Sequence, residues 1–110
     1  MATYIQIGDR IDYKNTTNAA IEAGDVVALG TNRIAVADCQ IEPGELGTLA
    51  LTGVWEFPAD NGAAIEFGAI AYWDAVGKKM KASKSGSEIP AGICVLKKET
   101  AGTTVRIRLQ

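Results

Sequence analysis

Carboxylates are the most plentiful reactive side chains in this chain of 110 residues, which contains thirteen of them and no histidine. Two carboxylates that a fold brings together can act as acid and base, as in glycoside hydrolysis. A carboxylate at a turn more often accepts hydrogen bonds from backbone N–H groups or faces water. We expect this structural use for most of the set, which comprises Asp9, Asp12, Glu22, Asp25, Asp38, Glu42, Glu45, Glu56, Asp60, Glu66, Asp74, Glu88 and Glu99.

The patterns of other catalytic and cofactor sites are missing. Without histidine, the chain cannot form a Ser-His-Asp triad, a Cys-His pair or most zinc sites. A phosphate-binding loop has glycine, four residues, and then Gly-Lys-Ser or Gly-Lys-Thr. The one Gly-Lys pair, Gly77-Lys78, does not fit, because Tyr72 stands where the first glycine is needed and Lys79 where serine or threonine is needed. The sequence therefore predicts a protein that is not an enzyme and that has no catalytic residues, no cofactor and no metal site.

Cys39 and Cys94 form no CxxC pair, and we interpret them as small buried apolar side chains. The chain has no secretory signal and no apolar run near the roughly 20 residues that span a bilayer, so we expect synthesis in a cytoplasm and no membrane partner.

One phrase recurs along the chain and indicates turns that lead into strands. It reads IEAGDVVALG from Ile21, IEPGELGTLA from Ile41 and IEFGAIAYWD from Ile65, with a looser copy, IPAGICVL, from Ile89. Proline presets φ at the second position of a turn, and glycine supplies the positive φ that a type II turn needs at the third. The predicted turn-forming residues are Gly24, Pro43, Gly44, Gly68 and Gly92.

The runs that follow these turns are typical of short strands. Residues 24–37 and 68–82 are expected to form hairpins, and residues 46–57 and 92–109 two further pairs of strands. The uninterrupted apolar runs VVAL and ICVL are typical of central strands. The sequence predicts an all-β fold over residues 1–110, a single-domain barrel or sandwich of about eight to ten short strands with two loosely similar halves. Residues 1–9 are expected to be an extended N-terminal arm.

Charge and aromatic residues suggest contact surfaces. Residues 1–77 hold three basic and eleven acidic side chains, a sum of −8, whereas residues 78–110 hold eight basic and two acidic ones, a sum of +6. The basic set, which is Lys78, Lys79, Lys81, Lys84, Lys97, Lys98, Arg106 and Arg108, is either a docking face for an acidic partner or a row of solvent-facing strand positions. Trp55 and Phe57 share a strand face, and Trp73 suits a core or a subunit interface equally.

Several segments in this order, YIQIGDRIDY, AGDVVALG, LTGVWEFP, GAIAYWDAVGKKM and the final TTVRIRL, resemble the bacteriophage capsid cement (head decoration) family along nearly the whole chain. Some relatives carry a recombinase-like label, which the missing phosphate loop does not support. The resemblance implies a small β-rich structural protein, added to the outside of an expanded phage head, often as a trimer, to reinforce the shell.

For this chain the resemblance implies binding to the major capsid protein of a phage or prophage, as a homotrimer on the virion exterior, with no direct contact to nucleic acid. We predict contacts with the capsid or another subunit at Tyr4, Ile5, Gln6, Trp55 and Trp73, and hypothesise that the arm adds a strand to a capsid edge. Two other hypotheses of function stay open: a surface module that binds, for example, carbohydrate, and an enzyme with a carboxylate pair.

Overall fold

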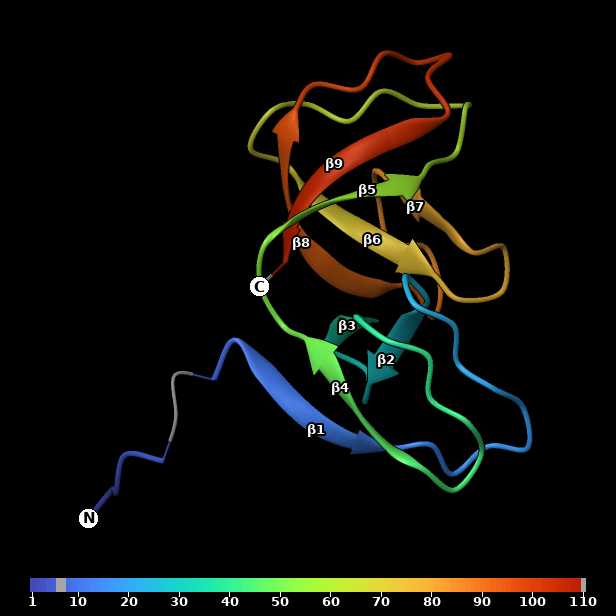
Figure 1. The fold of residues 1–110 in the computed structure, drawn as a ribbon. Helices are drawn as coiled ribbons and strands as arrows, with labels where there is room; N and C mark the ends of the chain where they lie inside the picture. Colours follow the sequence, from blue (N-terminus) through green and yellow to red (C-terminus); the bar gives the residue numbers. More distant parts are fainter. Residues whose placement is uncertain (6–7, 110) are drawn as a thin grey trace.

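A computed structural model of the chain describes residues 1–5 and 8–109. Their regular structure is entirely β, as predicted (Figure 1). No helix in these residues is long and apolar enough to cross a bilayer. The strands of the described residues are β1 (Arg10–Lys14), β2 (Val26–Leu29), β3 (Arg33–Ala37), β4 (Leu46–Ala50), β5 (Val54–Pro58), β6 (Ile70–Asp74), β7 (Lys79–Lys81), β8 (Ile89–Leu96) and β9 (Thr104–Leu109).

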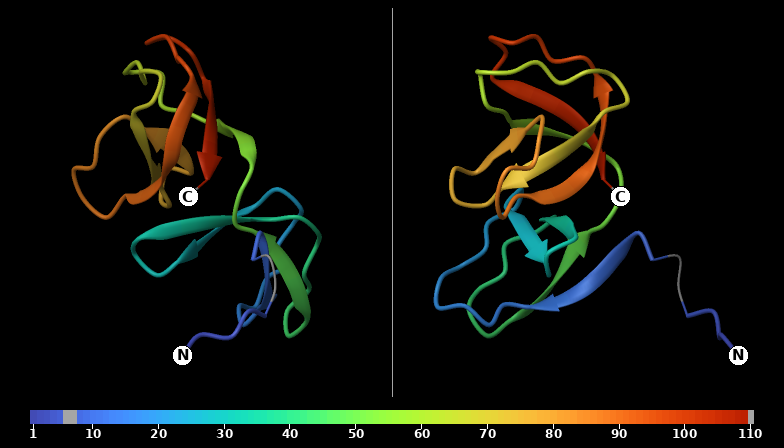
Figure 2. Two further views of the ribbon diagram at one scale, coloured as in Figure 1. Left: turned by 90° about the vertical axis from the view of Figure 1, so that its left-hand side faces the viewer. Right: turned by 180° about the vertical axis from the view of Figure 1, so that it is seen from behind.

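The strands form two antiparallel sheets, one from each half of the chain (Figures 1 and 2). The four-stranded sheet has the order β1-β4-β3-β2, and the five-stranded sheet has the order β5-β9-β8-β6-β7. The five-stranded sheet curls so that Ala59, just after β5, bridges to Met80 in β7. The arrangement is sandwich-like and not a closed barrel, and its two halves match the two sheets.

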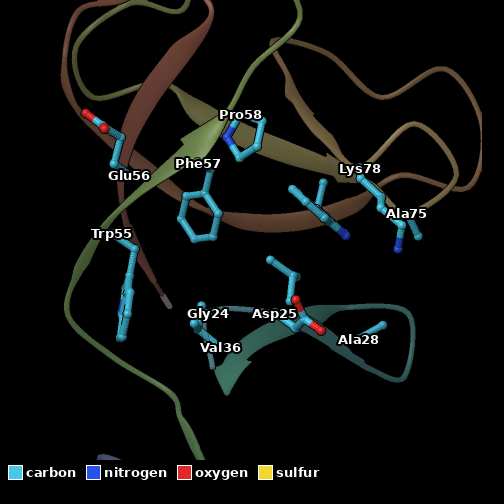
Figure 3. Close-up of a pocket in the computed structure, with 12 residues that line it drawn as sticks. Gly24, Asp25, Ala28, Val36, Trp55, Glu56, Phe57, Pro58, Ala75 and Lys78 are labelled. Carbon is cyan, nitrogen blue, oxygen red and sulfur yellow. The ribbon is translucent and has the colours of Figure 1, made fainter. Parts of the chain in front are cut away.

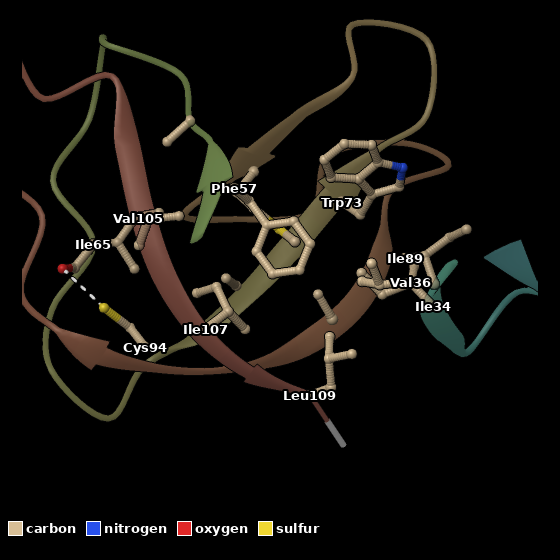
Figure 4. Close-up of a cluster of buried hydrophobic side chains, with 14 residues drawn as sticks. Ile34, Val36, Phe57, Ile65, Trp73, Ile89, Cys94, Val105, Ile107 and Leu109 are labelled. Atoms are coloured by element: carbon tan, nitrogen blue, oxygen red, sulfur yellow. Dashed lines mark hydrogen bonds between the residues drawn. The ribbon is translucent and has the colours of Figure 1, made fainter. Parts of the chain in front are cut away.

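The main core lies inside the five-stranded sheet and reaches the other sheet through β3. In β9, Val105, Ile107 and Leu109 are buried and alternate with exposed residues, as the sequence pattern predicted. Ile34 and Val36 of β3 pack into the same cluster (Figure 4). The opposite face of the four-stranded sheet has its own smaller cluster, with Ala35, Ala37, Ile41 and Leu49 buried. Strand β3 is therefore buried on both faces.

Three of the four repeated phrases are confirmed as turns. In each, the fourth residue donates its N–H to the carbonyl of the first, at 3.1 Å in residues 22–25, 3.0 Å in residues 42–45 and 3.1 Å in residues 66–69. The third residue has positive φ, 93° at Gly24, 83° at Gly44 and 83° at Gly68. Its N–H then donates to a neighbouring segment, to the carbonyls of Ala37, Asn15 and Cys94 respectively. Glycine at these positions is required by the backbone conformation.

The fourth phrase is not a turn, and the prediction for Gly92 is wrong. Gly92 lies inside β8, opposite Leu109 of β9. A Cβ at this position would collide with the backbone carbonyl oxygen of Arg108 on β9. Glycine is needed here because two strands approach closely, which the sequence of β8 alone cannot reveal.

Two expectations about strand pairing are also corrected. Strands β4 and β5 do not pair, because the chain passes from one sheet to the other between them, at Gly53 with φ of 104°. The VVAL strand, β2, is not central but lies at the edge of its sheet. The hairpins β2–β3, β6–β7 and β8–β9 form as predicted.

Candidate functional site

Residues 1–5, part of the predicted N-terminal arm, lie away from the two sheets, on the side where β1 begins (Figures 1 and 2). Tyr4 and Ile5 are 79% and 81% exposed. Within the described part of the chain, residues 1–5 make no hydrogen bond or ion pair to the body. Gln6, the third predicted contact on the arm, lies outside the described residues. The arm thus offers large apolar side chains that its own body does not cover.

The other predicted contacts, Trp55 and Trp73, both line a cleft of about 610 Å³ between the two sheets. Figure 3 shows Trp55 in its wall. Trp73 is only 7% exposed, and its ring lies 6.2 Å from that of Phe57, centroid to centroid. Trp73 therefore belongs to the core cluster and also lines the cleft. The other apolar residues in the wall of the cleft are Val26, Ala28, Val36, Pro58 and Ala75.

The rim of the cleft carries charges of both signs, from Asp25, Glu56 and Lys78. Asp25 accepts a hydrogen bond from the Glu22 N–H at 3.0 Å, which closes its turn. Glu56 forms an exposed ion pair with Arg106 at 3.7 Å. Lys78 has φ of 55°, a conformation unusual for a residue other than glycine. Aromatic walls with a polar rim suit an amphipathic occupant, with an apolar body and a polar tip.

Three carboxyl groups have shifted pKa values, and each pKa is lowered. The Thr48 hydroxyl, which donates to Asp38 at 2.6 Å, is the largest cause at Asp38, followed by Arg10 at 2.7 Å. Backbone N–H groups lower the other two, chiefly the Gly77 N–H at Asp74 and the N–H groups of Glu88 itself and of Gly86 at Glu88. A general acid needs a raised pKa. These carboxylates instead hold turns and loops, the use that the sequence favoured.

Residues 1–5 and 8–109 contain no group of three or more histidine, cysteine or acidic side chains that could hold a metal. Both cysteines are free, and the thiol of Cys94 is buried, as predicted, and donates to the backbone. Cys39 is only half-buried, so the prediction of burial is wrong for this residue.

The basic third of the sequence contains one lysine that is not on the surface. Arg106 and Arg108 point outward from β9, and Lys97 pairs with Glu66 at 3.8 Å. Lys98, however, is 3% exposed, and its Nζ donates to the carbonyls of Ala63, Glu99 and Thr100 at 2.6, 2.9 and 3.2 Å. Lys98 is thus neither a docking residue nor a solvent-facing one, because three backbone acceptors converge on it.

Asn15 has the same kind of role in the four-stranded sheet, and the sequence did not reveal it. It is fully buried, donates to the carbonyls of Ala19 and Ile41 at 2.8 and 2.9 Å, and accepts from the Thr17 N–H at 3.0 Å. Nothing in the stretch KNTTN separates this asparagine from an ordinary surface residue. Only the return of the loop after β3 brings the Ile41 carbonyl to it.

Comparison with known proteins gives one informative result. A family model described as phage cement protein matches residues 5–109, nearly the whole chain. No curated protein and no solved structure matches the chain.

Proposed function

The chain belongs to the phage cement protein family, and we propose that it binds the outside of an assembled phage capsid and stabilises the shell without catalysing a reaction. The family match over residues 5–109 carries this proposal. The lowered pKa values of Asp38, Asp74 and Glu88 favour the ionised carboxylate, so none of the three is suited to be the general acid of a carboxylate pair.

Reinforcement would come from many copies that bind together. A two-sheet body with a shared core supplies a rigid block. Multivalent attachment multiplies modest individual affinities, so weak contacts repeated over a shell can hold neighbouring capsomers together. The partner in this proposal is the major capsid protein. The chain itself is made in the host cytoplasm and acts as a homotrimer on the exterior of the virion.

The contacts in this proposal, with the capsid or with another copy of the chain, are the arm, with Tyr4, Ile5 and Gln6, and the cleft, with Trp55 and Trp73. Exposed apolar side chains of an unpaired segment favour binding to another chain, because that contact removes them from water. An extended segment can also form backbone hydrogen bonds with the edge of a sheet.

Co-sedimentation with phage heads tests the function. The purified protein is mixed with unexpanded and expanded heads, and the bound protein is measured per major capsid subunit. We expect saturable binding to expanded heads at a fixed ratio. A variant that lacks residues 2–7 should lose binding while keeping its circular dichroism spectrum. Absence of binding by the full chain to either form of the head would contradict the function.

A second candidate, a surface module that binds carbohydrate, is favoured by one observation: two tryptophans and two carboxylates line the same cleft. Titration with host surface polysaccharide, followed by tryptophan fluorescence, would detect such binding. A saturable shift that Trp55→Ala removes, together with no binding to heads, would favour this candidate over the first.

A further inference from the structure

The two sheets have four edge strands, and three of them are protected against pairing with another chain. Edge strands are commonly protected by charges, by proline or by shortness. In β1, the exposed positions are Arg10, Asp12 and Lys14. The three-residue β7 carries Lys79 and Lys81. Strand β5 contains Glu56 and ends at Pro58, and the bridge between Ala59 and Met80 joins its end to β7.

The fourth edge strand, β2, is also short, at four residues, but it has no charge and no proline. Its sequence is VVAL, without charge, proline or glycine. It pairs with β3 on one side only. An uninterrupted apolar run is typical of a strand that is covered on both faces. The composition of β2 fits this packing, and its outer edge is unpaired within one copy of the chain.

Both faces of β2 offer apolar contacts to an added strand. Val26 and Ala28 line the cleft on one face. Val27 packs against the small cluster of the four-stranded sheet on the other. Side chains of a strand alternate between faces, so an added strand would place half of them in the cleft and half over this cluster.

The chain itself contains a segment suited to this edge. Residues 1–8 carry no charged side chain, so their burial would remove no ionised side chain from water. Tyr4 and Ile5 are adjacent and would point to opposite faces of a strand. The phenol ring of Tyr4 with its polar tip matches the aromatic wall and charged rim of the cleft, and Ile5 matches the apolar cluster near Val27.

We propose that β2 accepts the N-terminal arm of a second copy of this chain as a fifth strand, with Tyr4 in the cleft between the sheets. The arm leaves next to β1, and β1 and β2 are the two opposite edges of the sheet. Donor and acceptor therefore differ, and the contact runs head to tail. Such a contact closes into a ring when its rotation permits.

A synthetic peptide of residues 1–9 tests the acceptor directly. It is titrated into the chain that lacks residues 1–8, whose body makes no hydrogen bond with residues 1–5, and the emission of Trp55 and Trp73 is followed. We expect a saturable shift below about 1 mM peptide. A peptide with Tyr4→Ala should bind at least about tenfold more weakly, and a scrambled peptide should not bind. Absence of saturation would overturn the proposal and leave the arm free for the capsid.

Variants of the full chain locate the contact. Ala28→Lys adds to β2 the kind of charge that protects β7, at an exposed position, and Val76→Lys is the control, with the same added charge on a loop residue that is 90% exposed. Sedimentation velocity over a concentration series should show self-association of the full chain and of the control variant, weakened at least about tenfold by Ala28→Lys.

A monomeric full chain, or equal association of both lysine variants, would overturn the assignment to β2. These experiments use no phage heads, so their failure is distinct from a failure of the capsid-binding function.

Discussion

The five-stranded sheet and the four-stranded sheet differ in how completely their edges and cores are closed. In the five-stranded sheet, the two edge strands approach each other at Ala59 and Met80 around the main cluster. In the four-stranded sheet, the edge strand β2 has no charge and no proline, and the separate cluster is bordered by half-buried residues, among them Ile11, Tyr13, Val27 and Leu29. The five-stranded sheet is complete in one copy, whereas the four-stranded sheet retains surfaces that another strand can cover.

The two regions resemble each other in how they hold their loops. Each uses one buried polar side chain that donates to backbone carbonyls, Lys98 in the second half of the chain and Asn15 in the first. Each also uses the same glycine turn. The contrast therefore lies in edges and core size, not in local structure, and differential stability can test it.

The largest effect is expected where strands approach most closely. Gly92→Ala places a methyl group against the backbone carbonyl of Arg108. Because relieving this clash requires a shift of a paired strand, the free energy of unfolding should fall by at least about 4 kcal/mol. Gly47→Ala in the four-stranded sheet meets the side chain of Ile41, which can shift, and should cost less. Urea denaturation measures both.

Gly62→Ala supplies the baseline for these glycine variants, because its added methyl group makes only an ordinary contact with Asp60. Equal losses for Gly92→Ala and Gly47→Ala would show that the backbone contact between β8 and β9 is not decisive.

The next effect compares the two clusters through identical substitutions. Ile107 and Ile41 are both fully buried, but Ile107 lies in the large cluster and Ile41 in the small one. Ile107→Ala should lower the free energy of unfolding by about 4 kcal/mol and Ile41→Ala by about 2 to 3 kcal/mol, since half-buried neighbours can relax into the space. Thermal and urea unfolding provide the measurement. The reverse order would contradict the view that the five-stranded sheet holds the better packed core.

A smaller loss is expected at the buried lysine. Lys98→Met keeps the length of the side chain but leaves the carbonyls of Ala63, Glu99 and Thr100 without their donor, which should cost about 2 to 3 kcal/mol. Lys97→Met is the matched control, because Lys97 makes only an exposed ion pair worth about 0 to 1 kcal/mol. If both variants unfold at the same urea concentration, Lys98 does not link these loops.

The smallest effect concerns acid stability of the four-stranded sheet. The pKa of Asp38 in the folded protein is lowered by the Thr48 hydroxyl and by Arg10, so folding favours the ionised carboxylate. This ionised group stabilises the folded protein above the ordinary aspartate pKa of about 3.9, and its contribution is lost as the pH falls below that value. Asp38→Asn should be less stable than the natural chain at pH 7, and this difference should shrink toward pH 2. A difference independent of pH would exclude this cause.

Much of the local structure followed from the sequence. Gly24, Gly44 and Gly68 had to be turns, because a positive φ is a local requirement that the residue type reveals. The alternation in TVRIRL had to be a strand with one buried face, because side-chain direction follows directly from the backbone. The family match over residues 5–109 likewise rests on the order of such segments.

Part of the candidate site also followed from the sequence. It singled out Trp55 and Trp73, which line one cleft, but not the cleft itself, which they share with Val26 of the other sheet. Their role as contacts stays a prediction.

Only the tertiary structure decided how distant segments meet. It placed β2 at an edge although VVAL is typical of a central strand, made Gly92 a point of close approach, and turned Lys98 and Asn15 inward. These outcomes depend on which strands pair and on which loops fold back against a strand. They involve residues more than twelve positions apart in the sequence. A residue's own conformational preference is short-ranged, so the sequence specified the turns and strand faces, and packing selected the partners.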